Sequence, residues 1–154
     1  MQKLTIDTGV QEFEINNGGV LRFNPSDPNV YHRFMDTIHK VEDIEKALVE
    51  QAKTLPDQDS GAAVLALLAK ADKDTKVALT EAFGADNDFE QLMEGVNLMA
   101  VASNGERVIT NLLDSLRPII EKGVKRFYDD KANAAVAQAK ANRAQRRAAG
   151  KQHR

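Results

Sequence analysis

The sequence predicts an α+β protein that is mostly α, with a short N-terminal antiparallel β-meander, a bundle of four to five helices and a basic C-terminal helical tail. Apolar residues alternate with polar ones over 3–24, which is the period of a one-sided sheet. Over 28–128 they recur every three or four residues, which is the helical period. Beyond that point large apolar residues almost disappear. We therefore expect one domain at 1–130 and a tail at 131–154 that is helical or disordered.

The composition sets the size of the core and excludes several chemistries. The chain has 154 residues, of which 42% are apolar and none is Trp, so we expect one modest aliphatic core between helices. Because there is no Cys, disulfides, thiolate metal sites and thiol nucleophiles are excluded. The N-terminus MQKLTIDTGV lacks the apolar segment of a signal peptide, and no apolar run approaches the roughly 20 residues of a membrane span. We expect a cytoplasmic protein without a membrane segment.

Charge is divided unevenly along the chain. The last 24 residues carry seven Lys or Arg and no acidic residue. Subtracting this +7 from the net charge of −2 leaves −9 for residues 1–130. Such an asymmetry predicts a folded acidic body with a separate basic arm.

The β-meander is predicted from three short alternating segments, KLTID at 3–7, EFEI at 12–15 and VLRF at 20–23. The turns between them, DTG and NNGG, are rich in residues that tolerate positive φ. A sheet this small needs a helix to cover its apolar face. The segment NPSDP then ends the sheet.

The first helix is predicted at about 28–53. Ser26 or Asp27 can cap its N-terminus, and Pro28 suits its first turn. A loop, TLPDQDSG, follows at 54–61. The apolar stripe of this helix consists of Tyr31, Phe34, Ile38, Val41, Ile44 and Leu48.

Two further helical segments are predicted in the middle of the chain. The first runs from about 60 to 83 and ends at Gly84, although DKDT at 72–75 leaves open a break with Asp72 or Asp74 as a second cap. Its apolar side contains Val64, Leu65, Leu67, Leu68, Ala71, Val77, Leu79 and Phe83. The second segment begins at ADND and ends before the turn SNG at 103–105. Its apolar face contains Phe89, Leu92, Met93, Val96 and Met99.

The last long helix is predicted to start near Glu106. Pro118 lies inside it and predicts a kink or a restart, because proline removes a backbone donor and clashes with the preceding turn. From Lys131 the sequence keeps a high helix propensity but has no apolar face, so we expect a marginal, fraying helix. The apolar stripe before that point is Ile109, Leu112, Leu113, Leu116, Ile120, Val124 and Phe127.

No motif in the sequence predicts an enzyme, a cofactor or a metal site. His32 and His39 would lie about 10 Å apart at ~1.5 Å rise per residue, too far to share a zinc ion, so we interpret them as solvated. The acidic runs DQDSGAAVLALL and DKDTKVALTEAF have neither glycine at the sixth position nor glutamate at the twelfth position of a calcium loop, and they are interpreted as helix caps. Phosphate-binding, serine-hydrolase and zinc-protease motifs are absent.

The basic tail leaves three interpretations open. It can be a solvated extension, it can order on an acidic protein surface, or it can neutralise the phosphates of a nucleic acid. No aromatic residue stands among its basic residues for base stacking, and the acidic body repels a polyanion. A protein is therefore preferred to nucleic acid as the partner. The basic residues concerned are Arg143, Arg146, Arg147, Lys151 and Arg154.

Two stretches of the sequence, taken in order, resemble a known family. LTIDTGVQEFEIN followed by LRFNPSDPNVYHRF resembles the start of the tail assembly chaperones of siphophages and prophages of Gram-positive bacteria. In that family a β-meander leads through an FNPTD-like junction into an amphipathic helix. EAFGADNDFEQLMEGVNLMAVASNGERVITNLLDSL resembles the middle of the same proteins. The resemblance covers most of residues 3–128 and includes no catalytic signature.

The resemblance implies a non-enzymatic helper in the host cytoplasm that is not part of the mature virion. Such a chaperone binds the tape measure protein, keeps it soluble and helps recruit tail tube subunits; many are also made in a longer, frameshifted form. Candidate contacts for a tape measure helix are Met93, Val96, Leu98 and Met99, because Met adapts to varied partners. For any one of them, a position in the core is the stronger expectation. Candidate contacts for an acidic tube subunit are Arg143, Arg146, Arg147 and Lys151.

Three further interpretations stay open. Self-association of the chain is one. The second is a small nucleic-acid-binding protein that acts through the tail. The third is a structural virion component, such as a head–tail connector.

Overall fold

The structure is a computed structural model that describes residues 1–56 and 60–152. Within that range the side chains of residues 60, 127, 128, 130–132, 151 and 152 are not described. The chain is mostly helical, with a two-stranded antiparallel sheet near the N-terminus, which confirms the predicted fold class. The elements are β1 (Gln11–Ile15), β2 (Gly19–Phe23), α1 (Pro28–Lys53), α2 (Ser60–Phe83), α3 (Phe89–Leu92) and α4 (Val108–Gln152).

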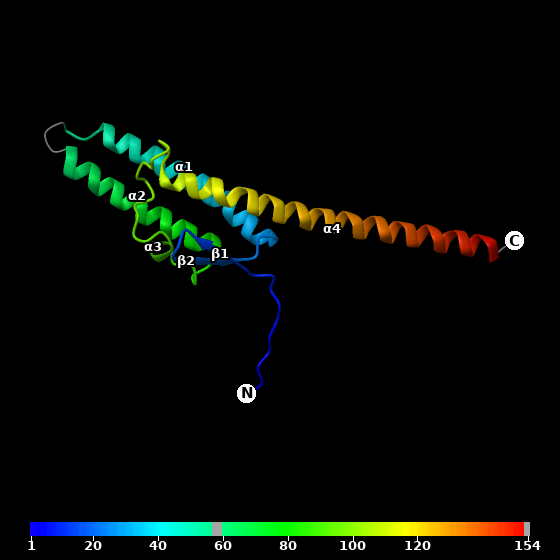
Figure 1. Cartoon of the computed structure of the whole chain (residues 1–154). Coiled ribbons are helices and arrows are strands. Elements are labelled where there is room, and N and C mark those ends of the chain that lie inside the picture. Colours follow the sequence, from blue (N-terminus) through cyan, green and yellow to red (C-terminus); the bar gives the residue numbers. More distant parts are fainter. Residues whose placement is uncertain (57–59, 153–154) are drawn as a thin grey trace.

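The sheet has two strands where three were predicted. β1 and β2 pair antiparallel, with Phe13 opposite Leu21. The segment at 3–7, predicted as the first strand, instead runs away from the body (Figure 1), and Leu4 and Ile6 are 83% and 74% exposed. The prediction of a strand there is wrong for the single chain. Alternation identifies a segment suited to a strand, but it does not supply a neighbouring strand.

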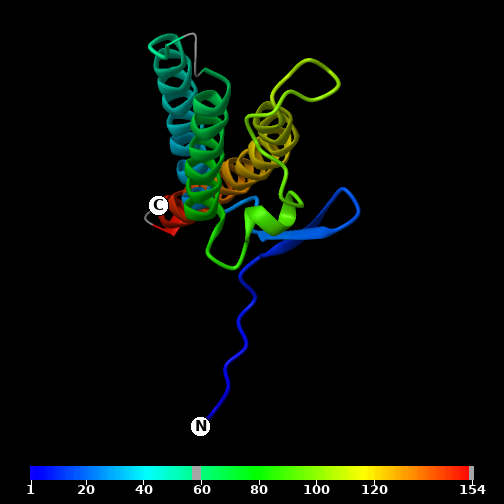
Figure 2. The same cartoon turned by 90° about the vertical axis from the view of Figure 1, so that its left-hand side faces the viewer.

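Helix α1 matches its prediction, and it packs lengthwise against α2 in a helical hairpin (Figure 2). The Asp27 carboxylate caps its N-terminus by accepting the N–H of Asn29 at 2.9 Å, and Pro28 occupies the first turn. The buried stripe of α1 includes Val30, Phe34, Val41 and Leu48.

Helix α2 is continuous, without the break considered at 72–75. Asp72 caps no helix; its carboxylate accepts the N–H of Leu98 at 2.8 Å and pairs with Lys76 at 2.9 Å. Gly84 follows the last residue of the helix, as predicted. Its φ of +105° suits glycine, and its N–H donates to the Thr80 carbonyl at 2.8 Å.

The third predicted helix is much shorter than predicted. Helix α3 spans only Phe89–Leu92, with the Asp88 carboxylate accepting the N–H of Glu90 at 3.0 Å. Glu94 then has a positive φ of 53°, a conformation that cannot continue a right-handed helix. Residues 93–99 are therefore not helical, and of the apolar residues predicted on one face there, Met99 is buried whereas Val96 is exposed.

Helix α4 runs without interruption from Val108 to Gln152, and Pro118 causes no restart. Its buried residues Ile109, Leu116 and Ile120 pack on the body. The side chain of Phe127, predicted to continue this stripe, lies outside the described residues. Every described side chain over 133–150 is exposed, and this part of the helix projects beyond the body (Figure 1). We call residues 133–152 the α4 arm.

Phenylalanine side chains from four elements pack against one another in the core. Phe83, at the end of α2, lies with its ring centroid 5.0 Å from Phe23 of β2, 6.2 Å from Phe34 of α1 and 5.8 Å from Phe89 of α3. The buried Asn87 fixes the sheet beside this cluster. Its amide group exchanges hydrogen bonds of 2.9 and 2.8 Å with the N–H and C=O of Arg22.

Removal of residues 133–154 is expected to change the melting temperature by less than about 2 °C. The described side chains of this segment are all exposed, so their removal takes no apolar contact from the core. Circular dichroism melting of the truncated and full chains measures the difference. A fall of more than a few degrees would show that the arm packs on the body.

Candidate functional site

The α4 arm carries a basic stripe. Lys140, Arg143 and Arg147 are three and four residues apart in turn, so they lie along one helix face, and Arg146 borders them. All four side chains are exposed, and none takes part in an ion pair among the described residues. The arm thus presents unneutralised positive charge over roughly 10 Å of helix.

Three of the four predicted tail contacts lie in this stripe or beside it. They are Arg143, Arg146 and Arg147. The fourth, Lys151, belongs to the helix, but its side chain is outside the described part of the structure. Arg154 and His153 also lie outside it.

The predicted apolar contacts do not form one surface. Leu98 and Met99 are fully buried, so in this structure they belong to the core and offer nothing to a partner. Met93 is half-buried against the same core, and Val96 is exposed. The backbone N–H of Leu98 donates to the Asp72 carboxylate of α2 at 2.8 Å, which holds this segment against α2.

An apolar groove with a charged rim lies between α2 and α3. Its volume is about 540 Å³, within the usual range for binding pockets. Val77 lies in it with 51% of its surface exposed. We call it the Val77 groove. Its lining residues are Asp72, Lys73, Lys76, Val77, Thr80, Glu81, Asp88, Phe89 and Glu90, so carboxylates outnumber lysines four to two.

One wall of the groove is fixed by the buried Lys76. Its Nζ lies 2.6 Å from a carboxylate oxygen of Glu90 and 2.9 Å from one of Asp72. Burial, the largest single influence, lowers the pKa of Lys76, but the two hydrogen-bonded carboxylates together outweigh it and raise the pKa above its ordinary value of 10.5. A raised folded-state pKa means that this stabilisation is complete at neutral pH and is lost only as the pH rises through that value.

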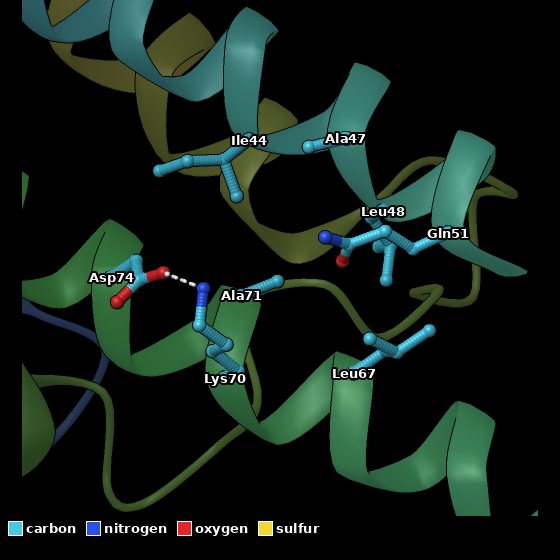
Figure 3. A pocket seen from close by; sticks show the side chains of 8 residues that line it. All are labelled: Ile44, Ala47, Leu48, Gln51, Leu67, Lys70, Ala71 and Asp74. Carbon is cyan, nitrogen blue, oxygen red and sulfur yellow. Dashed lines mark ion pairs between the residues drawn. The ribbon is translucent and has the colours of Figure 1, made fainter.

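A smaller hollow lies between α1 and α2 (Figure 3). Ile44 and Leu48 of α1 face Leu67 of α2 across it, and the ion pair between Lys70 and Asp74, at 3.4 Å, stands beside it. Its volume is about 80 Å³. That is room for a few water molecules, and it is far below the size of a cofactor site.

The described residues show no arrangement for metal binding. Over 1–56 and 60–152, no three His, Asp or Glu side chains are grouped so that they could hold a metal ion. His32 and His39 are exposed on α1. In the same part of the chain, no helix combines the length and apolar character needed to cross a membrane.

The Val77 groove was not predicted from the sequence. Val77 and Leu65 were both placed on the apolar side of their helix, and that prediction is wrong, since both are exposed. A signal was present for Val77, because its neighbours one turn away, Lys73 and Glu81, are charged and mark a polar face.

Scans of the chain against protein-family models, curated proteins and solved structures gave no match. The resemblance to tail assembly chaperones therefore stays a prediction from the order and spacing of sequence segments.

Proposed function

We propose that this chain is a tail assembly chaperone, a non-enzymatic protein that binds a tape measure protein and helps recruit tail tube subunits in the host cytoplasm. The observation that carries the proposal is a separation of two surfaces. The body presents the acid-rimmed Val77 groove, while the basic α4 arm projects away from the body. Two partners of different chemistry can therefore be held at once.

The Val77 groove suits an amphipathic helix, the expected structure of a tape measure protein. An apolar side chain of such a helix would cover Val77, and a basic residue flanking it would meet the rim carboxylate of Asp88. The carboxylate of Glu81 already pairs with Lys40 at 3.0 Å. Each Å² of apolar surface buried in the groove contributes roughly 25 cal/mol, and most of this gross gain is offset by ordering and association costs. Binding of this kind is reversible, as a chaperone requires.

The α4 arm suits the second role, recruitment of an acidic tube subunit. Its basic stripe carries no neutralising partner among the described residues. Because the charges are exposed, attraction to an acidic surface would be screened by salt. The interaction is therefore expected to be salt-sensitive, unlike burial in the groove.

Co-expression with the tape measure protein encoded beside this gene is expected to move the tape measure from the insoluble to the soluble fraction. Val77→Asp should abolish the effect, because it places a charge on the apolar part of the groove. Leu65→Asp is the matched control: it makes the same change at an exposed position of the same helix, outside the groove. If the unmodified chain leaves the tape measure insoluble, the proposed function fails.

The exposed basic stripe also supports a second candidate, binding of a nucleic acid. Electrophoretic mobility at low salt distinguishes the two, since a phosphate-binding arm would shift DNA or RNA and its deletion would abolish the shift. Mass spectrometry of purified virions distinguishes a chaperone from a structural virion component. A chaperone is missing from them, whereas a connector is present.

A further inference from the structure

The first seven residues have the pattern of a β-strand but no strand to pair with. Leu4 and Ile6 alternate with Lys3, Thr5 and Asp7, and both apolar side chains are largely exposed. Figures 1 and 2 both show this segment leaving the body. We call residues 1–7 the N-terminal arm.

The root of the N-terminal arm is fixed to the body. The side-chain amide of Asn24 donates to the Thr8 carbonyl at 3.0 Å, and the Asp7 carboxylate accepts the N–H of Gly9 at 2.9 Å. Gly9 has a φ of +74°, and a Cβ there would lie 2.7 Å from the Asn24 amide nitrogen. These contacts set the direction in which the arm leaves, which is away from its own sheet.

Strand β1 has a free edge. Both the N–H and the C=O of Arg22 bond to Asn87, so they point away from β1. Glu12 lies opposite Arg22, and by the alternation of antiparallel pairing the N–H and C=O of Glu12 and Glu14 point away from β2. No backbone hydrogen bond among the described residues uses these four groups.

An antiparallel strand formed by the N-terminal arm matches this edge. Phe13 is half-buried on β1 and stacked on Phe23 with 4.9 Å between ring centroids, so part of its surface is still accessible. Leu4 would cover that accessible part, and opposite charges would meet one position away. The cross-strand pairs would be Lys3 with Glu14, Leu4 with Phe13 and Thr5 with Glu12.

Charge and apolar pairing together select this register. Of the two shifts by two residues that keep the apolar side chains on the same face, one places Asp7 opposite Glu12, two like charges. The other pairs Lys3 with Glu12 but places Leu4 opposite Gln11, so the apolar contact with Phe13 is lost. A shift of one residue turns Leu4 and Ile6 to the solvent face.

We propose that the N-terminal arm adds as a third strand to the free edge of β1 in a second copy of this chain. The occupant is a second copy because arm and edge match in alternation and in charge, while the fixed root carries the arm away from its own edge. A reciprocal exchange closes as a two-fold dimer. This assembly is independent of the proposed function.

Sedimentation equilibrium of the full chain is expected to show a dimer as the protein concentration is raised to about 0.5 mM. Deletion of residues 1–7 should give a monomer, and so should Glu12→Pro, which removes an outward N–H while leaving the pairing with β2 in place. Glu12→Ala is the matched control and should remain a dimer. Thermal melting of each variant confirms that it is folded.

Mixing the two monomeric variants tests the exchange directly. The arm-deleted chain keeps its edge and the proline variant keeps its arm, so the mixture is expected to associate through one arm–edge contact. A full chain that stays monomeric at the highest concentration overturns the proposal. A dimer that survives deletion of the arm overturns it as well.

A charge exchange tests the register. Lys3→Glu and Glu14→Lys should each weaken the dimer by about 2- to 30-fold, since each change acts at both contacts, and the double variant should recover most of the loss. Equal weakening in the double variant would exclude this pairing of Lys3 with Glu14.

Discussion

Replacement of Phe83 by Ala is expected to lower the free energy of unfolding by about 3–5 kcal/mol. The ring is buried and lies against Phe23, Phe34 and Phe89, which come from three different elements. Its removal leaves a cavity where the sheet, α1 and α3 meet, so stability and the attachment of the sheet are lost together. Urea unfolding followed by circular dichroism measures the change.

Two controls separate the cost of a buried cavity at Phe83 from the cost of losing a phenyl ring elsewhere. Phe83→Leu keeps an apolar side chain of similar volume at this position and should cost less than the alanine change. Phe13→Ala removes the same ring from a half-buried position at the edge of the sheet and should also cost less. A loss below about 1 kcal/mol for Phe83→Ala would contradict a joining role for this residue.

Gly123→Ala is expected to destabilise the protein, although alanine is the better helix former by about 1 kcal/mol. A Cβ at Gly123 would clash with the backbone carbonyl oxygen of Pro25. The position of the Cβ is fixed by the backbone of α4, and the oxygen belongs to the backbone of Pro25. No side-chain rotation can therefore relieve the clash, and α4 or the segment after β2 has to move. Such overpacking costs about 1–3 kcal/mol or more, which exceeds the gain in helix propensity.

The matched control for Gly123 lies on the same helix. Gly150 has no atom within 4 Å of the position its Cβ would take, so Gly150→Ala is expected to be neutral or slightly stabilising. Thermal melting of the two variants should therefore give shifts of different size, with a clear decrease only for Gly123→Ala. Equal shifts would mean that α4 does not approach Pro25 closely in solution.

The helices were predictable where local signals determine them. The bounds of α1 follow from Asp27, Pro28 and an uninterrupted apolar stripe, and the end of α2 follows from Gly84. The basic arm was predicted from composition, since seven basic residues without an acid or an apolar face leave little to bury. These features depend on neighbours within one or two helical turns.

Features set by distant contacts were not predictable in the same way. Spacing alone did not show that Glu94 takes a positive φ and ends α3, or that Leu98 is drawn inward by Asp72. The Val77 groove depends on where α3 packs, which no local pattern of α2 specifies. The missing third strand has the same cause, because the contact of Asn24 with Thr8 that turns residues 1–7 away from the edge of β1 is not visible in the alternation of the segment itself.

The continuity of α4 has a geometric consequence. Its 45 residues form one uninterrupted helix, so the part anchored in the core continues directly into the part beyond it. From residue 124 to residue 152 the helix spans roughly 40 Å at ~1.5 Å per residue. A partner that bound near residue 152 would therefore lie well away from the body, and α4 approaches the segment after β2 closely where Gly123 meets Pro25.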